Sequence, residues 1–156
     1  MRRWMVSAVV VGSIVAVPLT VAAVTLHNGS PLDHQRAKTQ VRAASTSSTR
    51  WITVPDLHNL DVCAVGEVSA TLSVNVTGAP SEFRVLVDGG PLMVPHRVHF
   101  NPRNGTTSFS FTFVIHVTTF EGSDGHLFDV QWRAPNGGVT TLRSGNVNLL
   151  FHVGNC

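Results

Sequence analysis

The chain has 156 residues, enough for one domain of ordinary size. Eleven basic and nine acidic side chains leave a formal net charge of +2, and the longest run of basic residues is Arg2-Arg3. This scattered charge argues against a nucleic-acid partner, because phosphate binding needs a concentrated basic surface. Only 13% of the residues are charged, and the mean hydropathy of +0.18 comes mostly from the first 26 residues.

An apolar segment without charged side chains runs from residue 4 to residue 26, directly after Arg2-Arg3. At 1.5 Å per helical residue it is long enough to cross about 30 Å of hydrocarbon, and the two arginines favour a cytoplasmic N-terminus. Two interpretations stay open for residues 1–26. One is a signal peptide cleaved after the small residues Val21-Ala22-Ala23, and the other is an uncleaved transmembrane anchor. Both predict an extracytoplasmic protein, either secreted or held on the membrane with its C-terminal domain outside.

Residues 27–50 change to a polar composition rich in Ser, Thr, Ala, Gln and Arg, with no apolar period of 2 or 3.6. Such a composition is typical of a disordered linker. The folded domain is then expected over residues 51–156.

Apolar and polar residues alternate along several stretches of this domain, which predicts strands with one buried face. The alternating apolar rows are Val68 to Val76, Phe83 to Val87, Phe109 to Val117, Phe128 to Trp132 and Val147 to Val153, with an earlier strand at Leu60 to Val65. Turn residues separate the rows, as at Gly78-Ala79-Pro80, Asp88 to Pro91 and Asn136-Gly137-Gly138. These features predict an all-β fold, a two-sheet antiparallel β-sandwich that follows the N-terminal hydrophobic helix and the linker.

The chain has two cysteines, Cys63 in the early strand and Cys156 at the last position. An even pair in an exported domain predicts a disulfide bond, which would hold the last strand beside the early one. Two free thiols or a shared metal are the competing interpretations, although two cysteines alone make an incomplete metal site.

Four segments together resemble secreted bacterial immunoglobulin-like or jelly-roll-like β-sandwich modules. They are Val68 to Gly78, Phe83 to Gly89, Ser108 to Ile115 and His126 to Arg133. The resemblance implies a fold and a surface or secreted setting, and it implies no functional residues.

A second hypothesis is a small extracytoplasmic metal-binding protein that uses Met93, His96 and His99. Positions three apart on a strand face opposite sides, so the two histidines meet one ion only if the chain bends at Pro95. A third hypothesis is an unrecognised secreted hydrolase. We predict no enzyme, no catalytic residue and no cofactor, because the sequence has no Gly-x-Ser-x-Gly motif and its Ser, His and Asp spacings select no triad.

The leading hypothesis, to which the metal-binding protein and the hydrolase are alternatives, is a non-catalytic module that binds a protein or a cell-envelope polymer, or serves as a structural surface domain. Membrane association is expected through residues 4–26 if they are not cleaved. Leu86, Val114 and Leu150 stand at the polar positions of their strands, where they predict either a partner-facing patch or contacts covered by a loop. Trp51, where the linker meets the domain, is expected to stack on a sugar or to pack over the end of the sandwich.

Overall fold

A computed structural model describes residues 34–40, 42–102, 105–118 and 125–153. All regular elements within these residues are strands, so the prediction of an all-β fold is confirmed. The apolar segment 4–26 lies outside the described residues, and no described helix is long and apolar enough to cross a membrane. The strands are β1 (His34–Gln40), β2 (Ala44–Thr46), β3 (Ile52–Thr53), β4 (Leu60–Gly78), β5 (Ser81–Val87), β6 (Val98–Phe100), β7 (Thr107–Val117), β8 (Gly125–Arg133) and β9 (Thr140–Val153).

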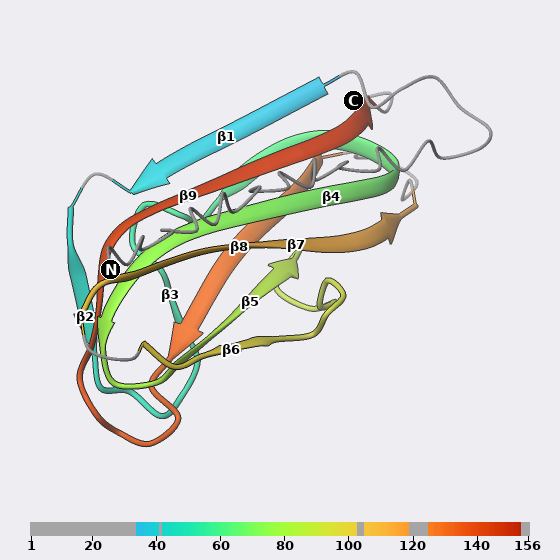
Figure 1. The fold of residues 1–156 in the computed structure, drawn as a ribbon. Helices are drawn as coiled ribbons and strands as arrows, with labels where there is room; N and C mark the ends of the chain where they lie inside the picture. Colours follow the sequence, from blue (N-terminus) through green and yellow to red (C-terminus); the bar gives the residue numbers. More distant parts are fainter. Residues whose placement is uncertain (1–33, 41, 103–104, 119–124, 154–156) are drawn as a thin grey trace, which may run out of the picture.

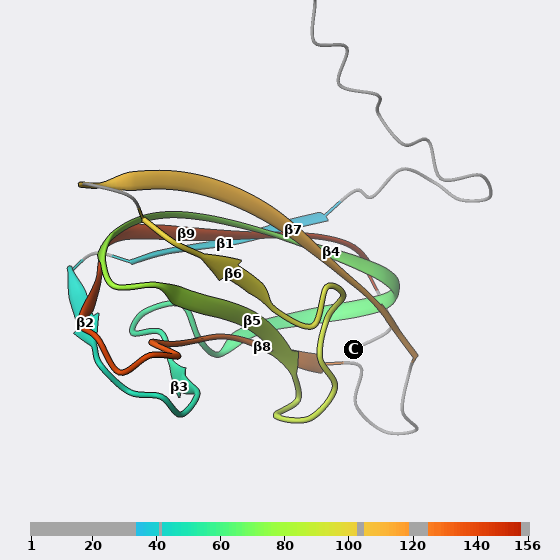
Figure 2. The same ribbon diagram turned by 60° about the horizontal axis from the view of Figure 1, so that its bottom comes forward.

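Hydrogen bonds join these strands into one antiparallel sheet. Its main path is β1-β9-β4-β8-β5-β6, while β7 pairs with β4, β3 with β8 and β2 with β9. The sequence predicts two stacked sheets, whereas β4 pairs with β8 at its beginning and with both β7 and β9 along the rest. In Figure 2, β7, β4, β9 and β1 lie on one side and β5, β8 and β3 on the other.

The change of partner along β4 occurs at a bend. Leu60 to Cys63 pair with β8, and the pairing with β9 shifts register between Val65 and Val68. Gly66 lies in this irregularity with a φ of +81°, a conformation that glycine adopts without the steric penalty of a side chain. The sequence pattern predicts two strands here, and the structure joins them into one strand of 19 residues.

Side chains from both sides of the folded sheet form one hydrophobic core. The alternating rows predicted from the sequence supply it, because one parity of each strand faces inward. Full burial of each large side chain contributes about 1.5–3 kcal/mol. The largest fully buried side chains include Trp132, Phe83, Phe113, Phe128, Leu57, Leu60, Leu72, Met93, Leu142 and Leu149.

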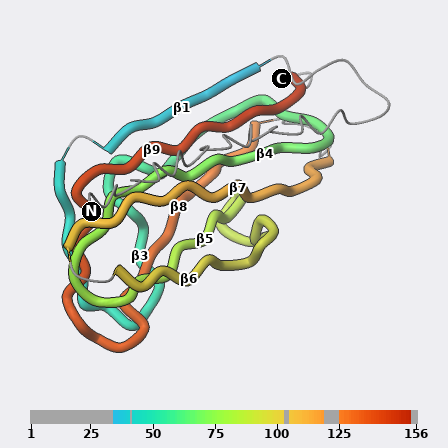
Figure 3. The backbone as a smooth tube through the Cα atoms, viewed as in Figure 1, coloured from blue at the N-terminus to red at the C-terminus, as the bar shows by residue number. Residues whose placement is uncertain are grey.

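The prediction of a disordered linker at residues 27–50 is wrong for two of its parts. Residues 34–40 form β1 and residues 44–46 form β2, and both strands pair with β9 (Figure 3). Most β1 side chains are exposed, so the strand buries little apolar surface and shows no apolar alternation. Backbone hydrogen bonds to the edge of β9 hold β1 in place. Amino-acid composition does not predict a strand that is stabilised in this way.

The turn predicted at Gly78-Ala79-Pro80 is confirmed, since it connects β4 to β5. Gly78 has a φ of +94°, and a Cβ atom at this position would meet the carbonyl oxygen of Val139. Glycine is required here for both reasons. Asp88 to Pro91 likewise follows β5, and Asn136-Gly137-Gly138 lies between β8 and β9.

Candidate functional site

Several charged side chains gather on the outer face of β5, β6 and β8. We call this group the arginine–tryptophan cluster, and its members are Trp51, Glu82, Arg84, Arg97, His99, Gln131 and Arg133. The strand register brings them together: Glu82 is opposite both Arg133 of β8 and His99 of β6, and Arg84 is opposite Gln131. Alternation along β5 directs Glu82 and Arg84 away from the core residue Phe83 between them.

Glu82 is the central acid of the cluster, with a side chain that is 10% exposed. Arg133 donates to its Oε2 atom from Nε at 2.8 Å, and the Nη2 atom of Arg133 forms an ion pair with the same oxygen at 2.7 Å. Arg97 and His99 approach the same carboxylate at 3.9 Å and 3.5 Å. Burial raises the pKa of Glu82, but the hydrogen bond and charge of Arg133, together with Arg97 and His99, outweigh it. The pKa therefore lies below its ordinary value of 4.5, and Glu82 is held as a carboxylate.

Trp51 lies one residue before β3 and holds two guanidinium groups over its ring. The guanidinium carbon of Arg84 is 4.4 Å from the ring centroid, and that of Arg133 is 4.6 Å from it. These distances are typical of cation–π contacts. Sequence reasoning expects Trp51 on a sugar or over the end of the sandwich. The structure places it against the two arginines.

The cluster carries more positive than negative charge, because it contains the three guanidinium groups of Arg84, Arg97 and Arg133 and the single carboxylate of Glu82. Arg84 donates from Nε and Nη2 to the Oε1 atom of Gln131, at 2.9 Å and 2.6 Å. Burial and the charge of Arg133 both lower the pKa of Arg84. The Nη1 atoms of Arg84 and Arg133 donate no hydrogen bond to the described residues, so both retain donors for an anion.

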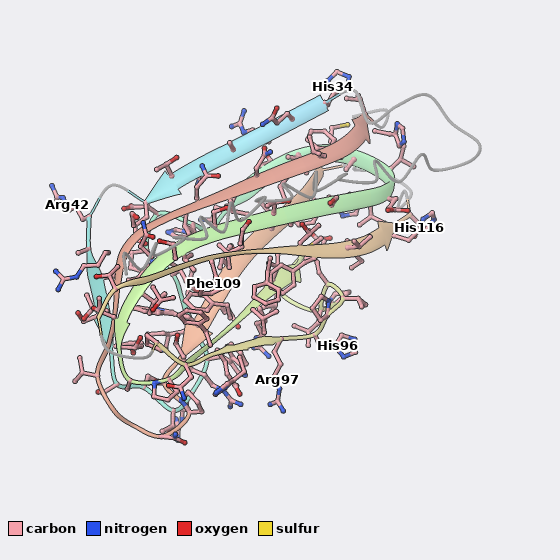
Figure 4. All side chains as sticks on the ribbon, viewed as in Figure 1. His34, Arg42, His96, Arg97, Phe109 and His116 are labelled. Atoms are coloured by element: carbon pink, nitrogen blue, oxygen red, sulfur yellow. The ribbon has the colours of Figure 1, made fainter. Side chains whose placement is uncertain are left out.

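The candidate metal ligands Met93, His96 and His99 do not converge on one point. Met93 is fully buried in the core, whereas His99 is exposed and lies beside Glu82. His96 and Arg97 point outward from the chain before β6, as Figure 4 shows. Within the described ranges, no three His, Cys, Asp or Glu side chains are grouped so that they would hold a metal ion.

Among the described residues, the shortest contact between a histidine and a carboxylate lies elsewhere, at the beginning of β8. The Nδ1 atom of His126 is 2.7 Å from Oδ2 of Asp88, and the other carboxylate oxygen accepts the backbone N–H of Leu127. A catalytic dyad would need a nucleophile at the second ring nitrogen. The Nε2 atom of His126 is buried and has no hydrogen-bond partner among the described residues. The backbone N–H of Asp88 also donates to the carbonyl of Leu127, so these contacts attach the turn after β5 to β8.

Leu86, Val114 and Leu150 do not form one patch. Leu86 is buried, and its backbone bridges to Leu92 in the segment that follows β5. Val114 and Leu150 are half-buried and lie on either side of Ser69, on the face formed by β7, β4 and β9. Leu86 is therefore not part of an exposed patch, and the other two belong to a different surface.

Cys63 lies near the beginning of β4, where the next residue, Ala64, pairs with Val153 of β9. The predicted proximity of the early and last strands is confirmed. The described part of the chain contains no free cysteine. Cys156 lies outside the described residues, three positions after Val153.

Comparison with protein-family models finds no match for this chain, and comparison with curated proteins finds none either.

Proposed function

We propose that the protein is a non-catalytic extracytoplasmic module that binds an anionic polymer of the cell envelope through the arginine–tryptophan cluster. The observation that carries the proposal is the pair of guanidinium groups over Trp51, whose hydrogen bonds to the described residues use Nε and Nη2 and leave Nη1 as a donor for a ligand. Guanidinium groups bind carboxylate and phosphate oxygens, and stacking on an aromatic ring orients them for this contact.

The fold suits this role as a rigid support. Arg84 and Arg133 project from β5 and β8, two paired strands whose opposite faces carry buried core residues such as Phe83 and Trp132. Side chains fixed on paired strands lose less conformational freedom on binding than side chains on loops. As the finer fold, we propose a two-sheet sandwich of the immunoglobulin-like or jelly-roll-like kind, with β4 shared by the two halves.

Extracytoplasmic location is part of the proposal and rests on the apolar residues 4–26 and on the cysteine pair. A Cys63–Cys156 disulfide would attach the end of the chain to β4. Intact mass measured before and after reduction, on separate membrane and secreted fractions of the native host, tests both points. A gain of two hydrogens on reduction supports the bond, and free thiols in both fractions contradict it.

Binding is tested with three soluble polymers: polyphosphate, polygalacturonate and neutral dextran. The full chain is expected to bind one or both polyanions more weakly as salt is raised, and to leave dextran unbound. Preference for polyphosphate or polygalacturonate then identifies the anionic group. Equal binding of dextran, or no binding of either polyanion, would contradict the proposal.

Arg84→Gln is the variant that separates ligand binding from folding. It is expected to weaken polyanion binding about tenfold, since hydrogen bonds to charged groups contribute about 1.5–3 kcal/mol. Arg143→Gln serves as the matched control, because Arg143 is exposed on β9 and outside the cluster. An equal effect of the two substitutions would show that only net charge matters.

A further inference from the structure

The edge of the sheet formed by β7 lacks the features that normally prevent an edge strand from pairing with another strand. Strand β7 pairs with β4 along one side, and its other side is bridged at Val114 alone within the described residues. Residues 107–113 contain no charged residue, no proline and no glycine. Natural edge strands are usually protected by charge, by proline or by short length.

The other edge strands have such protection. Strand β1 carries Arg36 and Lys38, while β2, β3 and β6 are only two or three residues long. The unprotected length of β7 therefore distinguishes it from every other described edge. A strand of this kind is a site for adding another strand.

The backbone of β7 shows which groups are available. Both the N–H and the carbonyl of Val114 bond to Val94, so the backbone groups of Val114 point away from β4. Backbone direction alternates along a strand. Ser108, Ser110 and Thr112 therefore direct their N–H and carbonyl groups to the same open side.

Partly uncovered aromatic side chains accompany this edge on its core side. Phe109 stacks on Phe100 with 4.0 Å between ring centroids and meets Phe111 edge to face at 5.4 Å. Phe111 remains 39% exposed although it stands on the core parity of β7. Figure 4 shows Phe109 in the region between β7 and β6. A strand added at this edge would extend the sheet over Phe111.

We propose that β7 pairs with β7 of a second copy of this chain, antiparallel and about a two-fold axis at Ser110. Residues 107–113 of β7 have no partner strand on their open side among the described residues, and we call them the free window. It begins with the strand at Thr107, ends at Phe113 before the bridge to Val94, and has Ser110 as its midpoint. In this register Ser110 faces Ser110 of the second copy, and Ser108 faces Thr112. These are the residues with open backbone groups, and they make about six inter-chain hydrogen bonds.

The same register also fits the side chains. Phe109 faces Phe111 of the second copy in a pair without mutual hydrogen bonds, where opposed side chains approach most closely. Both phenylalanines lie on the core side, and the Ser and Thr residues continue the outer face across the two copies. The absence of charge in the window means that two identical strands meet without repulsion. A second copy would therefore bond the open backbone groups of β7, cover its partly exposed phenylalanines and introduce no charge repulsion.

Cysteine substitution in the full chain tests the register. In Ser110→Cys the two introduced thiols face each other with Cα atoms about 5.5 Å apart, within disulfide range. Oxidation is expected to give a homodimer whose peptide map contains a 110–110 disulfide. Ser108→Cys is the matched control and should form no inter-chain disulfide, because its opposite residue in the paired copy is Thr112. Failure of Ser110→Cys to form the 110–110 disulfide, or equal cross-linking of the two variants, would overturn the proposal.

Copurification of two differently tagged full-length copies provides a second measurement. Ser110→Pro in both copies removes the open N–H and is expected to abolish copurification, whereas Ser110→Ala keeps the N–H and should preserve it. Copurification that persists in a folded Ser110→Pro protein would contradict pairing through β7. If Ser110→Pro does not fold, the comparison of the two cysteine variants decides. Neither readout depends on the arginine–tryptophan cluster.

Discussion

Replacing Glu82 with glutamine removes the carboxylate that pairs with Arg133 and Arg97 and leaves the shape of the side chain nearly unchanged. Glu82 accepts a hydrogen bond from Nε of Arg133 at 2.8 Å and forms an ion pair with Nη2 of the same side chain at 2.7 Å. Hydrogen bonds to charged groups contribute about 1.5–3 kcal/mol, and solvent screening reduces this because the Arg133 side chain is 24% exposed. We expect Glu82→Gln to lower the free energy of unfolding by about 2 kcal/mol at pH 7.

The difference between the two proteins should depend on pH. The pKa of Glu82 is lower in the folded state than its ordinary value of 4.5, so the ionised side chain stabilises the fold above that pH. This contribution is lost as the pH falls through the folded pKa, and wild type and Glu82→Gln should converge in acid. The assay is urea unfolding of both proteins from pH 7 down to pH 3.

Glu67→Gln provides the control, since Glu67 is a half-buried glutamate on β4 outside the cluster. Its free energy of unfolding should change by less than about 0.5 kcal/mol, as is usual for substitutions away from a specific interaction. If Glu82→Gln destabilises the protein equally at pH 3 and pH 7, the ionised carboxylate is not the source of the effect. The reasoning from the ion pair would then be refuted.

Two further substitutions test the core and the turn after β4, and both are measured by urea unfolding. Phe113→Ala removes a fully buried ring and should lower the free energy of unfolding by about 3–5 kcal/mol, whereas Phe111→Ala, at a 39% exposed position, should lower it by roughly 1–2 kcal/mol. Equal losses would show that the inner face of β7 is not packed as described. Gly78→Ala should lower the free energy of unfolding by about 1–3 kcal/mol, because its φ is +94° and the new Cβ meets Val139, while Gly90→Ala should be nearly neutral since its Cβ would have open space. A neutral Gly78→Ala would contradict the conformation of this turn.

The strands that supply the core are predictable because each is buried on one face. Val68 to Val76 and Phe128 to Trp132 alternate without interruption, and both lie within strands of the structure. Strand β1 could not be found in the same way. Its residues are mostly exposed and depend on pairing with β9, which lies about 100 positions later in the sequence. Local patterns carry no information about such a distant partner.

The arginine–tryptophan cluster was only partly accessible to sequence reasoning. Trp51 attracts attention as an aromatic residue at a domain boundary, and alternation along β5 places Glu82 and Arg84 on the outer face. The pairing of Glu82 with Arg133, however, depends on the register between β5 and β8. A shift of one residue would move Arg133 to the opposite face of the sheet, so composition and periodicity cannot select this contact. Conversely, Met93, His96 and His99 are close in sequence but are separated by burial.

The position of β9 between β1 and β4 has a consequence for the order of folding. It comes last in sequence among the described strands, yet β1 and β2 both depend on it, and β4 pairs with it along most of its length. Most contacts in the fold join distant residues, a topology that folds slowly. During synthesis, β1 and β2 have to wait for Thr140–Val153 before they gain a partner. The sheet therefore remains incomplete until Thr140–Val153 has emerged from the ribosome.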